Sequence, residues 1–347
     1  MIDWLREAPE ARRRALDGTL AFVDISGFTA MNEQLAQKGK LGAEEVTEVM
    51  NRTFERLLDV AYAAGGGLLK FGGDALLLFF TGPEHAARAC DAAYGMRTAL
   101  RELGDPQTSV GPVTLKMHVG IHADTFDFFL VGESHRELLL TGPAVTRTVE
   151  MESGAEAGEI LVSDETTATL PRDVLGESKA GGRLLEASPG VYGGIQPLPP
   201  LEGLDLAHCV PAQVRRVVQD GKAESEHRQA SVAFVHFGGV DDLLAEEGPD
   251  RVAEALDELV TGAQRVAEEH GVTFLETDID TDGGKMILVA GAPSTAGDDE
   301  ERILRTARGI ADLETQLPLR VGTSRGRVFA GEVGARFRRT YTILGKT

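Results

Sequence analysis

An internal repeat is the feature that most constrains how these 347 residues fold. Four apolar segments of the first half recur in the same order in the second half. They are the pairs 20–24 and 231–236, 46–61 and 252–266, 72–80 and 282–290, and 115–132 and 319–334. The offset between partners stays near roughly 200 to 212 residues, as a duplicated unit requires. The sequence therefore predicts two domains of one fold, each with its own core.

The repeat divides the chain into four segments. We expect an N-terminal helical segment at 1–17, where charged and helix-prone residues precede the first apolar stretch. The first domain then covers 18–170, and the second domain covers 228–347. Between them, residues 171–227 are rich in glycine and proline and lack sustained periodicity, which is typical of a connector.

Each domain is predicted to be a sheet with helices packed against it. In the first domain, the apolar positions within 44–64 keep helical spacing. A second helix is expected to start at Thr81 and Glu84, which have capping-box spacing. Further strands are expected at 113–122, 128–131 and 159–162. Helices that alternate with paired strands predict an α+β fold in which helices cover one face of the sheet.

Two carboxylates stand at strand ends of the first domain. The apolar stretch TLAFV runs into Asp24, and Asp74 occupies a Gly-Gly-Asp turn between two short strands. If this hairpin pairs beside the first strand, the two side chains converge into a site of hard oxygen ligands suited to Mg²⁺ or Mn²⁺. Asp24 also suits a helix cap and Asp74 a tight turn, so a purely structural role stays open at this stage.

Charge and composition exclude several classes of partner. The formal net charge is −20, from 55 acidic and 35 basic residues, so we expect no binding to nucleic acid or to anionic membranes. No apolar run approaches the roughly 20 residues that cross a bilayer, and the first residues lack the apolar core of a signal peptide. Two cysteines, Cys90 and Cys209, are too few for a disulfide framework. We expect a cytoplasmic protein.

The motifs FVDISGFT at 22–29 and KFGGDALLLFF at 70–80 closely resemble those of the class III nucleotidyl cyclases, the adenylate and guanylate cyclase family. The resemblance implies a ferredoxin-like core in each domain and conversion of ATP into 3′,5′-cyclic AMP and pyrophosphate. It assigns two Mg²⁺ or Mn²⁺ ions to Asp24 and Asp74, with the backbone carbonyl of Ile25 as a further ligand. The backbone amides that open the next helix are predicted to help hold the phosphates. This nucleotide-binding loop comprises Ser26, Gly27, Phe28 and Thr29.

The second domain lacks both carboxylates, since His236 stands where the first domain has Asp24, and Gly284 stands where it has Asp74. We therefore expect no metal in the second domain, because a lone imidazole is a poor Mg²⁺ site. This asymmetry resembles the tandem catalytic domains of the soluble adenylyl cyclases, over essentially residues 18–347. It implies an intramolecular, pseudo-twofold domain pair with one active site between the halves.

Two residues of the second domain are predicted to contact the base. Thr342, in the motif TYTILG, matches a base-contacting position of adenylyl cyclases, and Glu276 is the best match to the lysine that accompanies it there. Guanylyl cyclases use a glutamate near this position, because a carboxylate accepts hydrogen bonds from guanine. A solvated acidic turn would also explain Glu276. ATP is therefore the expected substrate and GTP the alternative.

Lys70 is assigned to a different pocket. The resemblance places it in the pseudo-symmetric second pocket, where soluble adenylyl cyclases bind a bicarbonate activator. The arginine that completes that anion pocket falls at Val149 in this sequence, although Arg147 is near. Lys70 is therefore a candidate for an anion or activator pocket whose second cation stays unassigned.

The last expectation concerns what the family places after the glycine that Gly345 matches. An asparagine four residues later orients the ribose, and an arginine four residues beyond it stabilises the developing phosphate charge, whereas this sequence ends at Thr347. The same offsets in the first domain fall on Thr146 and Glu150, which cannot replace them. We therefore expect a fragment of a longer protein with downstream domains, which binds Mg- or Mn-nucleotide but turns it over poorly. The alternative is a cyclase-derived regulatory module that binds nucleotide without turnover.

Overall fold

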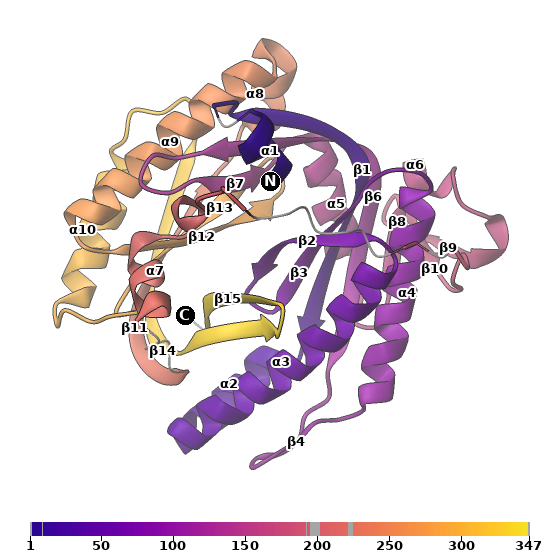
Figure 1. The fold of residues 1–347 in the computed structure, drawn as a ribbon, viewed down its shortest axis with the longest axis horizontal. Helices are drawn as coiled ribbons and strands as arrows, with labels where there is room; N and C mark the ends of the chain where they lie inside the picture. The colour runs from indigo at the N-terminus through magenta and orange to yellow at the C-terminus, as the bar shows by residue number, and fades with distance from the viewer. Residues whose placement is uncertain (1, 9, 192, 195–201, 221–224, 346–347) are drawn as a thin grey trace.

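The computed structural model describes residues 2–8, 10–191, 193–194, 202–220 and 225–345. The strands of these residues form two large sheets, one in each half of the chain, and one small pair. Figure 1 shows the first half, with α3 and α4, on the right and the second half, with α9 and α10, on the left. The fold is the predicted α+β fold.

The first sheet has the strand order β2-β3-β1-β6-β8-β10-β9, with β7 paired to β6. Its strands are β1 (Arg13–Ser26), β2 (Gly66–Gly72), β3 (Ala75–Phe80), β6 (Lys116–Val131), β7 (Glu137–Leu140), β8 (Ile160–Ser163), β9 (Leu175–Lys179) and β10 (Gly182–Leu185). The small pair is β4 (Gln107–Thr108) and β5 (Gly111–Pro112). The helices of this half are α1 (Ile2–Glu7), α2 (Phe28–Leu35), α3 (Lys40–Ala63), α4 (His85–Leu103), α5 (Pro143–Gly154) and α6 (Asp164–Thr167), with short 3₁₀ turns at Ala36–Lys38 and Arg172–Val174.

The second sheet has the strand order β12-β13-β11-β14-β15. Its strands are β11 (Glu226–Phe237), β12 (Thr273–Asp280), β13 (Gly283–Ala290), β14 (Leu319–Ala335) and β15 (Arg338–Leu344). The helices are α7 (Ala212–Gln219), α8 (Val240–Glu247), α9 (Pro249–Glu269) and α10 (Asp299–Ala311), preceded by a 3₁₀ turn at Ala207–Cys209. None of the helices in the described residues is long and apolar enough to cross a bilayer.

Side chains alternate along β1 between two covered faces. Ala21 and Val23 are buried in the core that α3 and α4 share with the sheet. The helical spacing of the apolar residues of α3 and α4 predicts this core. Leu20 points the opposite way and packs in a cluster with Val145 and Val149 of α5. The expectation that helices cover one face was therefore wrong, because α5 covers the other. By the same alternation, an even-numbered residue such as Asp24 lies on the α5 face.

The strand registers confirm the duplication. The central strand β1 lies between β3 and β6, and β11 lies between β13 and β14 in the same antiparallel manner. Asp24 pairs with Ala75, and His236 pairs with Lys285. Gly284 directly precedes Lys285, the partner of His236, just as Asp74 directly precedes Ala75, the partner of Asp24. This confirms the positional match read from the sequence.

The two halves pack against each other through apolar and polar contacts. Phe329, Val333 and Leu344 of the second half are buried in the same cluster as Phe71 of the first. Figure 1 shows β14 and β15 lying beside α2 and α3, in agreement with these contacts. The backbone N–H of Gly334 also donates to Asn51 Oδ1 of α3 at 2.9 Å.

The turn between β12 and β13 forms a second contact between the halves. Thr146 of α5 donates to Asp241 Oδ2 at 2.8 Å, and its hydroxyl accepts from the backbone N–H of Asp282 at 2.8 Å. Thr141 donates to the carbonyl of Gly283 at 2.9 Å. Thr146 stands at the first-domain position where the family's ribose-orienting asparagine would fall. Its hydroxyl instead links α5 to Asp241 and Asp282 of the second half.

Three boundaries differ from the sequence expectation. The N-terminal helix ends at Glu7 instead of residue 17, because residues 13–17 extend β1 along β6, where Arg13 pairs with Asp127 at 2.7 Å. The helix expected from Thr81 starts at His85, because Glu84 directly before it has φ 54°, a left-handed conformation that a right-handed helix does not include. The two strands expected within 113–131 are one continuous strand, β6.

Part of the expected connector belongs to the first sheet. Residues 175–185 form the hairpin β9–β10, which joins the sheet through β8. Ala180 and Gly181 both have positive φ, 48° and 75°, as a two-residue hairpin turn requires. Other parts of the connector, 195–201 and 221–224, and the final residues 346–347 lie outside the described residues.

Candidate active site at the domain interface

The two aspartates singled out in the sequence lie side by side. Asp24 sits near the end of β1, and Asp74 directly precedes its partner Ala75 in the β2–β3 turn. Thr29 Oγ1 of α2 donates to Asp74 Oδ2 at 3.3 Å. Burial and then the charge of Asp74 raise the pKa of Asp24 to about 6, and burial also raises the pKa of Asp74. Burial is the first cause of both shifts, and repulsion by the neighbouring carboxylate adds to the shift of Asp24.

Two further residues complete this acidic site, and sequence reasoning missed both. His118 of β6 lies across the sheet from Asp24, with its Nε2 3.5 Å from Asp24 Oδ2 and 2.8 Å from Oε1 of Glu152 on α5. The hydrogen bond to Glu152, followed by the charge of Asp24, raises the pKa of His118 against the opposing effect of burial. The imidazole is therefore biased toward the charged form that partly neutralises the carboxylates.

The donor set fits a divalent cation. One ligand atom from each of Asp24, His118 and Glu152 lies within 4.8 Å of the others. Carboxylate oxygens suit Mg²⁺ and Mn²⁺, and His118 would add a nitrogen ligand, which favours Mn²⁺ over Mg²⁺, only after it lost its proton. A bound cation would also relieve the repulsion that raises the pKa of Asp24. Asp24 belongs to this group and Asp74 lies beside it, and the assignment of the ions to Asp24, Asp74 and the Ile25 carbonyl stays a prediction.

The start of α2 adds backbone donors to the same place. Gly27 precedes the helix with φ 113°, a left-handed conformation that glycine adopts without strain. A Cβ at this position would also lie 2.6 Å from the Thr114 carbonyl oxygen. The first N–H groups of a helix have no partner within the helix. The loop from Ser26 to Thr29 therefore presents amides beside Asp74, a suitable arrangement for phosphate oxygens.

The second half supplies the facing wall. A cavity of about 570 Å³ lies against its sheet, lined by Phe234, His236, Asp278, Lys285, Ile287, Arg320, Val321 and Gly322. Asp278 comes so close to Gly72 of β2 that a Cβ there would lie 3.3 Å from Asp278 Oδ1. The cavity therefore adjoins the hairpin that carries Asp74. Its aromatic and aliphatic lining suits a flat apolar group, and its charged rim suits a polar one.

Glu276 occupies the counterpart of Lys70. Lys70 of β2 lies opposite Leu77, and Glu276 of β12 lies opposite Ile287, each directly after an irregularity in the pairing. Burial and then the charge of Asp278 raise the pKa of Glu276 to about 8. Glu276 is therefore neutral near pH 7, a state that the sequence could not indicate.

Thr342 faces the first domain from β15. It is fully buried, and it shares its strand face with Leu344, which packs in the cluster that contains Phe71. Leu344 Cδ2 lies so near Gly73 that a Cβ on that glycine would be 3.4 Å away. The strand that carries Thr342 therefore touches the turn that carries Asp74, and the predicted metal and base residues lie on facing surfaces.

Lys70 has an internal partner. Its Nζ lies 2.8 Å from Glu137 Oε1 and donates to the carbonyl oxygen of Thr277 at 3.2 Å and to the hydroxyl of the same threonine. Burial opposes ionisation of Glu137, but the charge of Lys70 and the contacts of His135 lower its pKa to about 2. An external anion at Lys70 would have to displace this carboxylate.

Arg147, the other cation considered for an anion pocket, is also engaged. Its guanidinium pairs with Glu150 at 3.2 Å and with Glu165 at 3.2 Å. These contacts hold the side chain at the α5–α6 corner, where it also binds the Gly181 carbonyl. The expectation that Lys70 serves an anion pocket stays a prediction, to which the geometry adds a competing group, Glu137.

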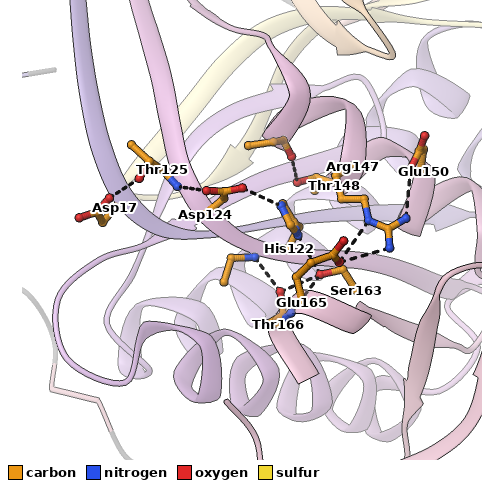
Figure 2. A network of polar contacts seen from close by, with 12 residues as sticks. Asp17, His122, Asp124, Thr125, Arg147, Thr148, Glu150, Ser163, Glu165 and Thr166 are labelled. Carbon is orange, nitrogen blue, oxygen red and sulfur yellow. Dashed lines mark hydrogen bonds and ion pairs between the residues drawn. The ribbon is translucent and has the colours of Figure 1, made fainter. Parts of the chain in front are cut away.

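A second polar network contains a serine, a histidine and an aspartate in contact (Figure 2). His122 Nδ1 lies 2.8 Å from Ser163 Oγ, and His122 Nε2 lies 3.4 Å from Asp124 Oδ2. Ser163 is fully buried and its hydroxyl caps α6 by accepting from the Thr166 N–H at 3.4 Å. A nucleophile must reach its substrate. This network therefore stabilises the β6–β8–α6 corner and is no candidate for hydrolysis.

Residues 13–184 match the family described as "Adenylate and Guanylate cyclase catalytic domain". Human adenylate cyclase type 10 is 23% identical over 375 residues, which cover 95% of this chain and 23% of that protein. An uncharacterized protein of Mycobacterium tuberculosis is 30% identical over 130 residues, 36% of this chain and 23% of that protein. The chain thus spans less than a quarter of the length of these curated relatives.

A solved structure matches over most of the chain. It is the crystal structure of a class III adenylyl cyclase-like ATP-binding protein from Pseudomonas aeruginosa. The match has a TM-score of 0.70 at 16% identity and covers 96% of this chain and 80% of the other. At this identity the likeness shows the fold, and it includes both halves of the chain.

Proposed function

Because residues 13–184 belong to the adenylate and guanylate cyclase family, we propose that this chain binds a purine nucleoside triphosphate with two Mg²⁺ or Mn²⁺ ions between its domains. We propose ATP as the substrate, with 3′,5′-cyclic AMP and pyrophosphate as products, and a cytoplasmic location. The observation that carries the proposal is the convergence of Asp24, Asp74 and the start of α2 at one sheet edge. We propose no activator and no further protein partner for this chain.

The reaction is an in-line displacement in which the ribose 3′-hydroxyl attacks the α-phosphorus and pyrophosphate leaves. The ions, when bound, would lower the pKa of that hydroxyl and neutralise charge on the departing phosphates. Asp24 and Asp74 would hold them, and the Ser26–Thr29 amides would orient the phosphate oxygens. His118 and Glu152 would keep Asp24 in place through the contacts described above. The chain's net charge of −20 does not oppose this, because the ions supply local attraction.

Adenine is the base that a neutral Glu276 suits. A protonated carboxyl both donates and accepts, which matches the acceptor N1 and the donor amino group of adenine. An ionised carboxylate only accepts, which matches the two donors of guanine. Because the pKa of Glu276 is raised to about 8, the neutral form dominates near pH 7. This observation supports ATP as the proposed substrate.

A guanylate cyclase is the second candidate, and one observation favours it. The counterpart of Lys70 in the second domain is a glutamate, as the strand registers place it. If a bound base ionised Glu276, the carboxylate would prefer guanine. The choice between ATP and GTP therefore depends on the protonation state of one side chain.

A nucleotide-binding module with little or no turnover is the third candidate. The solved structure that matches both halves carries the description "adenylyl cyclase-like ATP-binding protein". Thr146 and Glu150, at the offsets where an asparagine and an arginine assist the reaction, are engaged in holding the β12–β13 turn and pairing Arg147. Such a module would bind Mn-ATP at Asp24 and Asp74 without releasing pyrophosphate.

The test measures binding and turnover together. The purified chain is given ATP or GTP with Mn²⁺, bound nucleotide is measured by calorimetry, and cyclic products are separated by chromatography. We expect metal-dependent ATP binding and cyclic AMP at a rate above that of an Asp24→Ala, Asp74→Ala double variant. Cyclic GMP as the main product would establish the second candidate, and binding without product the third. Absence of metal-dependent binding to either nucleotide would contradict the proposal.

A further inference from the structure

Asn32 of α2 joins the two domains beside the candidate site. Its side chain is 2% exposed, and both ends of its amide bind groups of the second half. The amide nitrogen donates to the Leu344 carbonyl at 2.8 Å, and the amide oxygen lies 2.8 Å from His227 Nε2. Because the nitrogen faces a carbonyl, the oxygen must face the imidazole, so Nε2 carries the proton and donates.

The groups that Asn32 binds belong to one row across the second sheet. His227 of β11 pairs with Phe329 of β14, which pairs with Leu344 of β15. The His227 ring also meets Phe329 edge to face, with centroids 6.1 Å apart. Asn32 therefore reaches over the middle strand and ties α2 to both outer members of the row.

This row lies next to the residues of the site. Leu344 is two residues from Thr342 and packs against Gly73, the residue before Asp74. On α2, Asn32 lies three residues after Thr29, and side chains with this spacing share a helix face. Thr29 itself donates to Asp74 at 3.3 Å. A shift of β15 is therefore transmitted to α2 through the buried Asn32 amide, in addition to the apolar packing of Phe28, Met31 and Leu35 against Leu344.

We propose that Asn32 is a positioning residue, which sets the phosphate-binding start of α2 against the base-side strand β15 of the other domain. The proposal rests on the proposed function, since it gives the two sides of one nucleotide site a shared mechanical link. Asn32 touches no reacting atom. Its loss leaves the metal carboxylates present but separates the phosphate and base contacts that must engage one ligand at the same time.

Asn51 provides a matched control. It is also an asparagine on a first-domain helix, and its oxygen also accepts a hydrogen bond from the second half, the Gly334 N–H at 2.9 Å. It lies on α3, however, and contacts none of the proposed site residues. A role that is only structural predicts the same result for Asn32→Ala and Asn51→Ala, whereas a positioning role predicts different ones.

The experiment compares these variants with His227→Ala, which removes one of the two second-domain partners of Asn32, together with the 3.4 Å contact of His227 Nδ1 to the Gly39 carbonyl, and leaves the sequence of α2 unchanged. Two readouts are used: the dissociation constant for Mn-ATP, and amide hydrogen exchange of residues 26–35 without nucleotide. For Asn32→Ala and for His227→Ala we expect binding about tenfold weaker and faster exchange in 26–35. The double variant should bind no more weakly than Asn32→Ala, because that substitution already breaks the bond to His227. Asn51→Ala should change binding less than about twofold at a similar loss of melting temperature.

Each outcome decides one of the two claims. Equal effects of Asn32→Ala and Asn51→Ala on binding and on exchange of 26–35 would overturn the positioning role and leave the proposed function intact. If the unmodified chain does not bind Mn-ATP, the proposed function fails. The link is then judged by exchange alone: unchanged protection of 26–35 in both Asn32→Ala and His227→Ala overturns it.

Discussion

The two domains share one row of three neighbouring strand positions but fill it with different ionisable groups. The row is Ala75, Asp24 and His118 in the first domain, and Lys285, His236 and Arg320 in the second. The residues beside the central position do not differ in this way, since Val23 and Val235 are both fully buried. Apolar alternation therefore maintains the common fold, and the exposed ends of the strands are free to carry different chemistry.

A second matched pair repeats this contrast. Lys70 and Glu276 hold equivalent places on β2 and β12, and each has a different environment. Lys70 is paired with Glu137, whereas Glu276 stands near Asp278 and becomes neutral. Lys70 thus forms an ion pair within the first domain, whereas Glu276 is a neutral hydrogen-bonding group near Asp278, which lines the cavity.

The largest expected effect comes from breaking the ion pair. Glu137→Ala leaves the Lys70 ammonium buried beside Thr277 without a counter-charge, so we expect a loss of roughly 3–5 kcal/mol in the free energy of unfolding. Urea unfolding monitored by circular dichroism measures it. Glu150→Ala is the control, because it removes one partner of an ion pair with a half-exposed glutamate and should cost less than about 1 kcal/mol. Equal losses in both variants would show that the buried Lys70–Glu137 pair contributes no more to stability than an exposed one.

The next effect concerns the two neighbouring aspartates of the first domain. Asp24→Ala and Asp74→Ala should each slow cyclic nucleotide formation by about a hundredfold or more, close to 2.7 kcal/mol, while the fold persists. The control is Asp124→Ala, which removes an exposed carboxylate of β6 outside the site and should change the rate less than twofold. Retention of more than half the rate by Asp74→Ala would refute its role as a metal ligand.

A smaller effect tests whether the second domain has room for the missing aspartate. A Cβ on Gly284 would lie 2.7 Å from the Phe237 ring and 2.9 Å from the Asp278 carbonyl oxygen. Gly284→Ala should therefore lower the free energy of unfolding by about 1–3 kcal/mol. Gly322→Ala, where a Cβ meets no atom within 4 Å, is the control for the loss of a strand glycine. A Gly284→Ala variant as stable as Gly322→Ala would mean that packing does not exclude a carboxylate here.

The smallest effect is a change in pH dependence. Glu276 keeps its proton in the folded state up to about pH 8 but loses it near pH 4.5 when unfolded. The folded state then binds more protons between these values, so stability falls as pH rises through this window. Glu276→Gln removes this dependence, so its stability relative to the unmodified chain should rise as the pH increases from 5 to 9. Urea unfolding at pH 5, 7 and 9 measures it, and parallel profiles would contradict a neutral Glu276.

Sequence patterns located the elements that depend on local spacing. The strand ending in Asp24, the hairpin carrying Asp74 and the duplication follow from alternation, turn residues and a fixed offset. They did not locate His118 or Glu152, because cross-strand register and the placement of a helix over a sheet depend on tertiary packing. Nor did they identify Asn32, whose partners lie about 200 residues or more away and which has no unusual neighbours in the sequence.

The boundaries that differ have equally specific causes. Residues 13–17 follow charged and helix-prone residues and were expected to be helical with them. Pairing with β6 and the ion pair between Arg13 and Asp127 make them a strand. The β9–β10 hairpin was hidden in a glycine-rich stretch, where Ala180 and Gly181 form a turn. Tertiary partners determined both regions, and local propensity did not.

The central claim is that Asp24 and Asp74 of the first domain bind divalent ions with a nucleotide. The row of Lys285, His236 and Arg320 in the second domain does not. The most direct measurement is a Mn²⁺ titration followed by electron paramagnetic resonance, in the presence of a slowly hydrolysed ATP analogue. For the unmodified chain we predict two Mn²⁺ ions bound per chain. An Asp24→Asn, Asp74→Asn double variant, which keeps the second-domain row intact, should bind none in the same range. Binding of Mn²⁺ with unchanged stoichiometry and affinity by the double variant would contradict the account.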